Sequence, residues 1–508
     1  MRATRAVVIG LCLLVCLSAM SCAPGTKAPK KLTVVEGTAI TTLSAHHSTA
    51  TPDRHVHILL YQTLVKLDSR QNIVGDLAES WSSTPDGLSM TFKLKKNYKF
   101  SDGTPVDAEA VKYNIEKFPD KNYGHVYRSL YEVIAGAEVI DPYTVKIVTK
   151  QPFSPLLASL CIPSAAIQSP AAIEKWGKEY AQHPVGSGPY MLKELGTDYV
   201  RLERNPYWPG PKGYWDEIVQ RAVPEASARA AMLQTGEADI VVKIAPEDVT
   251  RLQGNPDFAI QVLPSMYQIS FEINTRKPPF TDVRVRKALN YAVDRQAIVD
   301  NILQGLGDVA VSAVGPGQMY RKTFPPYPYD ITRTKALLTE AGLPDGFKAK
   351  LWAPSGRYLK DKETAEAVQQ YLAKAGVTTD LRIWEWAPYG EVTKGIPTAE
   401  TERELFMMGR AVFGADYMMY RLWYSTSTMN VTGYVNPRVD ELLAGARTTF
   451  DTSKQREMYE EVQRIVFQED PPFLWLHSQK QIVGVRKGIT GLVVQPTEWL
   501  ELRDVKGS

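Results

Sequence analysis

Residues 77–116 place the strongest constraint on the fold, because turn formers, a strand pattern and a helix cap follow one another there. Residues 85–87 are turn formers, and residues 90–95 then alternate between apolar and polar side chains, as on a half-buried strand. After a second turn, Asp107 can cap a helix whose apolar residues recur at helical spacing. The run therefore predicts a hairpin-like element followed by a capped helix.

The rest of the chain continues this alternation of strands and helices. Residues 32–36 favour a first strand, Asp53 can cap a helix after it, and residues 137–149 have the pattern of a hairpin. Farther on, a helix is expected to stop at Gly236, and another is expected to begin after the cap Asp282. Strands and helices in alternation predict a layered α/β architecture.

Length and charge narrow the class of protein. At 508 residues the chain exceeds the size at which one hydrophobic core stops growing, so we expect two or more lobes and a cleft between them. The 59 basic and 56 acidic residues give a formal net charge of only +3, and the basic residues are scattered along the chain. This distribution predicts that the chain does not bind nucleic acid.

Sequence motifs of enzymes are missing from the chain. It has no GxSxG, HExxH or Walker sequence, and the Pro in GSGP at residues 186–189 suits a strand corner better than a phosphate cradle. We therefore expect no enzymatic activity and no cofactor.

The N-terminus has the pattern of an export signal. Arg2 and Arg5 precede an apolar run at residues 6–19 that is too short to span a bilayer. Residues 17–22 are similar to a bacterial lipoprotein cleavage box, in which Cys22 would be acylated. Ala19 departs from the usual Leu, Val or Ile of that box, so cleavage without lipidation is the alternative.

We therefore predict a lipoprotein-type signal peptide at residues 1–22 and a tether at residues 23–31, which are rich in Pro, Gly and Lys. No disulfide is expected in the mature chain unless Cys22 stays unmodified, because Cys161 has no other partner. Cys161 lies in an apolar stretch, which favours a buried, inert thiol.

Several short sequence motifs in the chain resemble those of one protein family. LAESW, DGL and DGTP within residues 77–116 are joined by GSGPY at residues 186–190, RNPYW at 204–208 and TGEADI at 235–240. Together they resemble the family-five extracytoplasmic solute-binding proteins of ABC importers, which include peptide, dipeptide and nickel binders. The resemblance implies an α/β, periplasmic-binding-protein-like fold (type II, three-domain cluster C type) with two lobes around a ligand cleft.

The resemblance also implies a division of the chain into three parts. The discontinuous lobe I would take residues 32–72, 185–270 and 478–508. An inserted domain II would take residues 73–184, and lobe II, which is domain III, would take residues 271–477.

The candidate ligand residues lie in MMGRAVFGADYMMY. Oligopeptide binders of the family have a similar RA...ADY string, whose aspartate meets the α-ammonium of the ligand, and this implies that role for Asp416 with Tyr417 beside it. A structural ion pair or cap is the alternative for Asp416. Arg410 would attract a ligand carboxylate or brace Asp416. Residues 418–420 depart from the polar, Pro-containing stretch of oligopeptide binders, which puts a standard peptide ligand in question.

Two further groups of residues are candidates. Trp384, Trp386 and Tyr389 stand where family members often line the cleft, although packing at a strand end explains them equally well. A histidine cluster gathers four of the seven histidines, and a metal site is considered because imidazole suits nickel and zinc. Its members are His46, His47, His55 and His57. No Cys or second carboxylate completes a ligand set, so we predict no metal site there.

These observations predict an extracytoplasmic receptor, in the periplasm or at the cell surface, anchored to the membrane by lipid. We expect a monomer that captures a small solute, with a peptide favoured, and delivers it to ABC permease subunits served by a separate ATPase. Alternatives on the same fold are a receptor for nickel or a metal chelate, or for an opine or oligosaccharide. An extracytoplasmic hydrolase is the alternative of another class.

Overall fold

The computed structural model describes residues 29–68, 72–411 and 414–507. The predicted signal peptide, the predicted lipidation site Cys22 and residues 23–28 of the predicted tether lie outside these residues. No helix within the described part of the chain combines the length and apolar character that crossing a bilayer requires.

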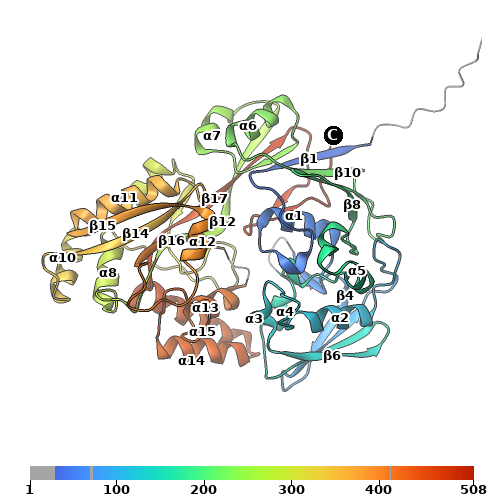
Figure 1. Ribbon diagram of the computed structural model, residues 1–508, viewed down its shortest axis with the longest axis horizontal. Coiled ribbons are helices and arrows are strands. Elements are labelled where there is room, and N and C mark those ends of the chain that lie inside the picture. The colour runs from blue at the N-terminus through green and yellow to red at the C-terminus, as the bar shows by residue number, and fades with distance from the viewer. Residues whose placement is uncertain (1–28, 69–71, 412–413, 508) are drawn as a thin grey trace, which may run out of the picture.

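One large mixed sheet runs through the molecule (Figure 1). Its strand order is β15-β14-β16-β12-β17-β11-β1-β10-β9-β8, with β13 paired to β17. The strands are β1 (Lys31–Glu36), β8 (Tyr190–Leu195), β9 (Tyr199–Arg204), β10 (Glu217–Ala222), β11 (Ile240–Val242), β12 (Phe258–Ile273), β13 (Gly307–Val309), β14 (Phe347–Ser355), β15 (Val377–Glu385), β16 (Leu405–Arg410) and β17 (Phe473–Arg486).

The two longest strands, β12 and β17, join the two halves of this sheet. They pair antiparallel from Phe258 opposite Arg486 to Glu272 opposite Phe473. Near one end β17 pairs with β11, while near the other end β12 pairs with β16. Figure 1 shows β14, β15 and β16 on one side of these strands and β1, β8 and β10 on the other.

A second, four-stranded sheet lies apart from the large one, in the order β4-β5-β7-β6. Its strands are β4 (Ala78–Ser83), β5 (Ser89–Leu94), β6 (Ile134–Asp141) and β7 (Thr144–Thr149), and two small hairpins add β2 (Val65–Leu67) with β3 (Ile73–Gly75) and β18 (Val493–Val494) with β19 (Leu500–Glu501). The sheet has a core of its own, built around Phe92, Val111 and Ile147. Where the domains begin and end stays a prediction.

The helices cover these sheets. On the side of β1 they are α1 (Thr51–Leu60), α2 (Ala108–Lys117), α3 (Arg128–Tyr131), α4 (Leu156–Ser159), α5 (Pro170–Trp176), α6 (Ala226–Thr235) and α7 (Pro246–Leu252). On the side of β14 they are α8 (Val283–Tyr291), α9 (Arg295–Ala297), α10 (Ile331–Glu340), α11 (Asp361–Lys374), α12 (Trp386–Val392), α13 (Ala415–Trp423), α14 (Pro437–Thr448) and α15 (Thr452–Arg464).

Local signals in the sequence placed most of these elements. The hairpin β4–β5 and the helix α2 are confirmed, and the carboxylate of Asp107 accepts a hydrogen bond from the Ala110 backbone N–H at 2.9 Å. Asp282 caps α8 in the same way, and Gly236 ends α6 with a φ of 77°. A left-handed φ of this kind favours glycine.

The expected cap at Asp53 was wrong. Helix α1 begins at Thr51, two positions earlier, because Pro52 suits the first turn of a helix. The Asp53 carboxylate instead accepts hydrogen bonds from the hydroxyls of Thr41 and Ser48, both at 2.5 Å. It therefore ties the preceding loop to the helix.

Candidate functional site

A polar cavity of about 290 Å³ opens between the two halves of the large sheet, beside β12 and β17. Segments that are distant in sequence supply its walls. The segments near β1, α1, α6 and β11 and the C-terminal segment supply Glu36, His55, Arg229, Lys243 and Glu498, while β12 and the loop after β14 supply Tyr267, Arg357, Tyr358 and Leu359. Its volume is near the lower end of the range for sites that enclose small molecules, about 300–1,000 Å³.

Arg357 is a cation in the wall of the polar cavity, and aromatic rings surround it. It follows the end of β14, and its guanidinium lies 4.8 Å from the ring of Trp386 and 5.4 Å from that of Tyr358. Its Nε is buried and has no hydrogen-bond partner among the described residues. A buried polar atom without a partner is costly, which favours a ligand at this position.

A buried ion pair also lines the polar cavity. The side chains of His55 and Glu36 are in direct contact, and both are almost fully buried. Burial by itself lowers the pKa of His55, but the charge of Glu36 and the hydrogen bonds to the Glu36 carboxylate and the Glu498 carbonyl together outweigh burial, so the pKa is raised. Glu498 accepts a hydrogen bond from the Ser265 hydroxyl at 2.8 Å, and burial raises its pKa.

Other charged side chains in the polar cavity already have partners within the protein. Arg229 donates to the backbone carbonyls of Val223 and Pro224, at 2.8 and 2.7 Å. Lys360 pairs with Glu247 at 3.5 Å. In the described part of the chain, neither Arg357 nor Lys243 forms an ion pair. The cavity therefore presents an excess of positive charge, which suits an anionic group.

A second cavity, here called the apolar chamber, has a volume of about 300 Å³. Apolar side chains make up most of its wall, namely Leu67, Ile73, Pro155, Leu157, Ala158, Met266 and Met319. Polar side chains at its edge are Ser154, Gln318, Gln455, Asp416 and Tyr459. Met266 and the polar-cavity residue Tyr267 are neighbours on β12, so the two cavities lie close together along this strand.

Asp416 lies in the wall of the apolar chamber, within the first turn of α13, and 8 % of its surface is exposed. Both of its carboxylate oxygens are occupied. The guanidinium of Arg447 donates to them at 3.1–3.2 Å, and the hydroxyl of Tyr459 donates to Oδ1 at 2.8 Å. This geometry favours the structural ion pair, which the sequence left open as the alternative to a ligand anchor.

Arg410 forms its ion pair with Glu272 and not with Asp416. Its guanidinium donates two hydrogen bonds to Glu272, at 2.5 and 2.7 Å, and Glu272 is fully buried on β12. Arg410 therefore clamps β16 to β12, and among the described residues its ion pair is with Glu272 and not with Asp416. Tyr417 packs edge-to-face on Tyr127 with ring centroids 5.3 Å apart, which joins α13 to the opposite half of the molecule.

The three aromatic candidates differ in position. Tyr389 is fully buried and donates its hydroxyl to the carbonyl of Met407 at 2.7 Å, so it belongs to the core. Trp384 stacks under the guanidinium of Arg382 at 3.6 Å. Trp386 is exposed, at 37 %, and its ring faces Arg357. Of the three, Trp386 is the one that lies beside a side chain of the polar cavity.

Among the described residues, the four histidines of the cluster share no partner common to all of them, because each forms its own hydrogen bonds. His46 contacts the Tyr123 hydroxyl and the Ala166 carbonyl, both at 2.7 Å, while His57 donates to the Thr42 carbonyl at 2.9 Å. Burial lowers the pKa of His57 to about 4, so this ring is neutral. In the residues that the structure describes, no three His, Cys, Asp or Glu side chains are grouped to hold a metal ion.

Buried neutral histidines predict acid sensitivity. Burial lowers the pKa of His477 on β17 to about 3. On acidification this side chain is therefore protonated in the unfolded chain but stays neutral in the folded chain. Stability should therefore fall as pH decreases from about 6.5, by up to about 1.4 kcal/mol per pH unit for this side chain. Guanidinium unfolding between pH 6.5 and 4.5 should give a shallower pH slope for His477→Leu. The exposed His183→Leu serves as control, and an unchanged slope for His477→Leu would contradict the assignment.

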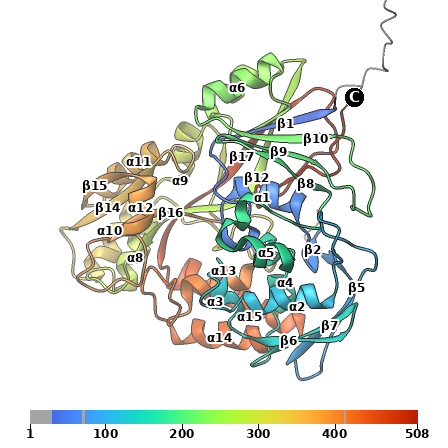
Figure 2. The same cartoon turned by 45° about the vertical axis from the view of Figure 1, so that its right-hand side comes forward.

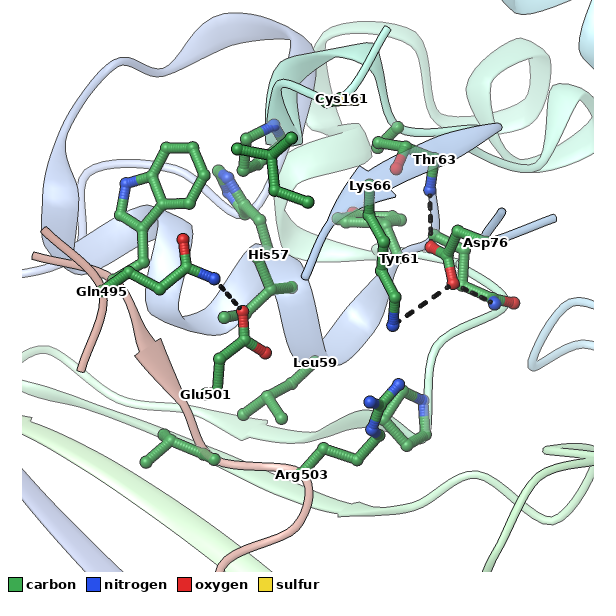
Figure 3. A pocket seen from close by; sticks show the side chains of 18 of the residues that line it. His57, Leu59, Tyr61, Thr63, Lys66, Asp76, Cys161, Gln495, Glu501 and Arg503 are labelled. Atoms are coloured by element: carbon green, nitrogen blue, oxygen red, sulfur yellow. Dashed lines mark hydrogen bonds and ion pairs between the residues drawn. The ribbon is translucent and has the colours of Figure 1, made fainter. Parts of the chain in front are cut away.

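Figure 3 shows a third cavity, between α1, the β2–β3 hairpin and the C-terminal segment. Its volume is about 80 Å³, which is room for about two or three water molecules. Lys66 and Asp76 pair across one side at 3.9 Å, and Gln495 donates to Glu501 at 2.7 Å. Cys161 in its wall is buried as expected, and burial raises the pKa of the thiol, which keeps it protonated and unreactive.

Sequence reasoning missed the residues that carry most of the charge at the site. Arg357 lies in a loop of no recognised motif, and Lys243 and Glu498 are remote from it in sequence. Arg447 and Tyr459, the partners of Asp416, come from α14 and α15. The one available signal was the SGRY turn at residues 355–358, which stands between a strand and a helix where ligand-binding loops are common.

Two halves of a sheet joined by long strands, with cavities between them, are the arrangement of a solute-binding protein. Residues 72–439 match the family described as bacterial extracellular solute-binding proteins, family 5 middle. The chain belongs to this family. The predicted α/β, periplasmic-binding-protein-like fold is confirmed, and the chain is an extracytoplasmic substrate-binding protein of an ABC importer.

Individual proteins of known function or structure cover nearly the whole chain. The glutathione-binding protein GsiB of Escherichia coli O1:K1 / APEC is 35% identical over 486 residues, which is 94% of each protein. The structure of HbpA2 from Haemophilus parasuis matches with a TM-score of 0.82 and 26% identity, over 94% of this chain and 100% of that one. The periplasmic binding protein DppA from Helicobacter pylori, solved with the peptide STSA, has a TM-score of 0.81 and 25% identity, over 94% and 98%.

Proposed function

We propose that the chain captures a small peptide-like solute carrying at least one carboxylate, and that the polar cavity binds this carboxylate. The observation that carries the proposal is Arg357, whose buried Nε has no partner among the described residues. A planar guanidinium suits a carboxylate because it can donate two parallel hydrogen bonds. Lys243 adds a second positive charge to the same cavity.

The peptide-like character of the solute is supported by the relatives. GsiB is a glutathione-binding protein, and the DppA structure contains the peptide STSA. The two cavities beside β12 have room for the two ends of such a solute, one end polar and the other apolar. Trp386 beside Arg357 offers a ring against which the solute can pack.

Ligand binding would favour the closed arrangement of the two halves, and only by the difference in affinity between the open and closed states. The permease would recognise that closed arrangement, and a separate ATPase would supply the energy. The chain itself would act as a monomer without enzymatic activity.

Export and anchoring are also part of the proposal. We infer that cleavage before Cys22 removes residues 1–21 as a signal peptide and that Cys22, then the first residue of the mature chain, carries a lipid, because Arg2, Arg5 and the apolar run precede it. Residues 23–31 would then hold the receptor off the membrane. Mass spectrometry of the mature N-terminus tests this, since a chain that begins with an unmodified residue would exclude the lipid.

A thermal-shift comparison tests the carboxylate proposal. Dipeptides and tripeptides with neutral side chains are each offered in the free-acid form and as the C-terminal amide. The free-acid forms should stabilise the protein, by about 2.7 kcal/mol at a ligand concentration a hundred times the Kd. The amides serve as the matched control and should stabilise it less, because they remove the anionic group. Equal shifts from acid and amide would contradict the proposal.

A further inference from the structure

The wall of the apolar chamber contains one carboxylate, Asp416, whose charge is neutralised by a guanidinium of the protein itself. Among the described residues in its wall, Asp416 is the one charged side chain, and Arg447 and Tyr459 occupy both of its oxygens. A ligand ammonium placed in this chamber would meet a carboxylate that has already paired with a guanidinium. Taking a cation out of water without a free partner is unfavourable.

Arg447 is held in place from several directions. Its guanidinium lies 3.4 Å above the ring of Tyr420 and 5.2 Å from that of Phe153. These ring contacts fix the cation where it pairs with Asp416. Tyr420 belongs to residues 418–420, the stretch in which the chain departs from oligopeptide binders. The stretch that differs from oligopeptide binders therefore supplies the Tyr420 ring. This ring positions Arg447, the cation that would compete with a ligand ammonium for Asp416.

The backbone next to Arg447 reaches the opposite half of the molecule. Ser154 donates its backbone N–H to the Arg447 carbonyl at 2.8 Å, and Gln455 donates to the Ser154 hydroxyl at 2.7 Å. Figures 1 and 2 both show α14 and α15 beside the half that contains α3 and β6. The ion pair thus stands at a place where the two halves touch, and releasing Arg447 would disturb these contacts.

One polar group in the chamber wall is unused. Gln318 is buried, and its Oε1 has no hydrogen-bond partner among the described residues. Its Nε2 is 3.6 Å from the sulfur of Met418. A neutral amide of this kind pairs with a neutral N–H or O–H of a ligand and carries no charge to balance an ammonium.

We propose that the part of the ligand in the apolar chamber is uncharged, so that the chain binds N-acylated amino acids or peptides and does not require a free amino group. This rests on the proposed capture of a carboxylate-bearing, peptide-like solute. Apolar walls accept the acyl group, and Gln318 accepts a hydrogen bond from the amide N–H that acylation leaves. Asp416 and Arg447 form a structural pair that joins α13 to α14.

Calorimetry with a matched pair of ligands tests this inference. Alanyl-phenylalanine and N-acetyl-alanyl-phenylalanine are titrated into the full mature chain at neutral pH. The acetylated form should bind as tightly as the free form, within about threefold, or more tightly. If Asp416 anchored an ammonium, acetylation would instead weaken binding by roughly tenfold or more. Binding of the free form alone would overturn the inference and leave the proposed function standing, whereas binding of neither form would overturn both.

The variant Asp416→Asn separates an anchor from a structural residue. It is nearly isosteric, and we expect the ratio of the two Kd values to stay within about threefold of the wild-type ratio. A selective loss of the free form would overturn the inference. Gln318→Leu is a second, apolar variant with an independent readout, since it should weaken the acetylated ligand. Unchanged binding of that ligand would argue against the assigned hydrogen bond and overturn that part of the proposal.

Discussion

Replacing Arg357 by Gln should weaken the binding of a carboxylate-bearing ligand by roughly 30-fold or more. Truncating one member of a desolvated, hydrogen-bonded charge pair costs about 2 kcal/mol or more, and each 1.4 kcal/mol is tenfold in affinity. Arg357 is half-buried, and its Nε lacks a partner among the described residues, so this N–H is available to the ligand. The measurement is the Kd from calorimetry with glutathione or a free-acid dipeptide.

Two control variants show whether the loss of affinity in Arg357→Gln comes from the polar cavity. Arg333→Gln removes an arginine that is about half exposed on α10 and lies 3.5 Å from Glu340, so the Kd should not change. Lys243→Gln should have a smaller effect than Arg357→Gln, because Lys243 is exposed and its charge is screened by water. If Arg357→Gln bound the ligand with the affinity of the wild type, the assignment of the polar cavity as the carboxylate site would be wrong.

Breaking the pair between Arg410 and Glu272 should cause the largest loss of stability. Glu272→Gln leaves the guanidinium of Arg410 buried without its counter-charge, and breaking such a pair costs about 3–5 kcal/mol. Because the pair joins β12 to β16, the loss should appear in the half of the sheet that contains β14 and β15. Denaturant unfolding followed by tryptophan fluorescence measures the loss.

The matched control for this prediction is Glu402→Gln. Glu402 pairs with Lys350 at 2.8 Å, but its side chain is 70% exposed, and such surface pairs contribute about 0–1 kcal/mol. The two variants remove the same charge, one from a buried pair with an arginine and the other from an exposed pair with a lysine. Equal losses from both would show that the Arg410 pair has no special weight and would support a ligand role for Arg410.

The elements of the fold were predictable where local chemistry decides the structure. Asp107 and Asp282 cap their helices because each carboxylate lies next to free backbone N–H groups, and Gly236 ends α6 because it accepts a left-handed φ. Asp53 was misplaced because Pro52 moved the start of α1. These signals act within a few residues, so the sequence alone displays them.

The site was less predictable because its pairs join remote segments. Asp416 was identified from its motif, yet its partners Arg447 and Tyr459 are 31 and 43 positions away. The sequence leaves open whether Arg410 attracts a ligand carboxylate or braces Asp416, whereas the register of β12 and β16 brings it to Glu272, 138 positions away. Such pairings depend on the packing of helices and strands, which no short motif records.

Native mass spectrometry of the mature protein, purified without refolding, tests the central claim most directly. A solute carried through purification identifies itself by mass, and its fragments show its functional groups. We expect a single non-covalent ligand that carries a carboxylate and an amide, and that is released chemically unchanged on denaturation. A bound metal ion, a ligand without an acidic group, or a hydrolysed product would contradict the capture of an anionic, peptide-like solute.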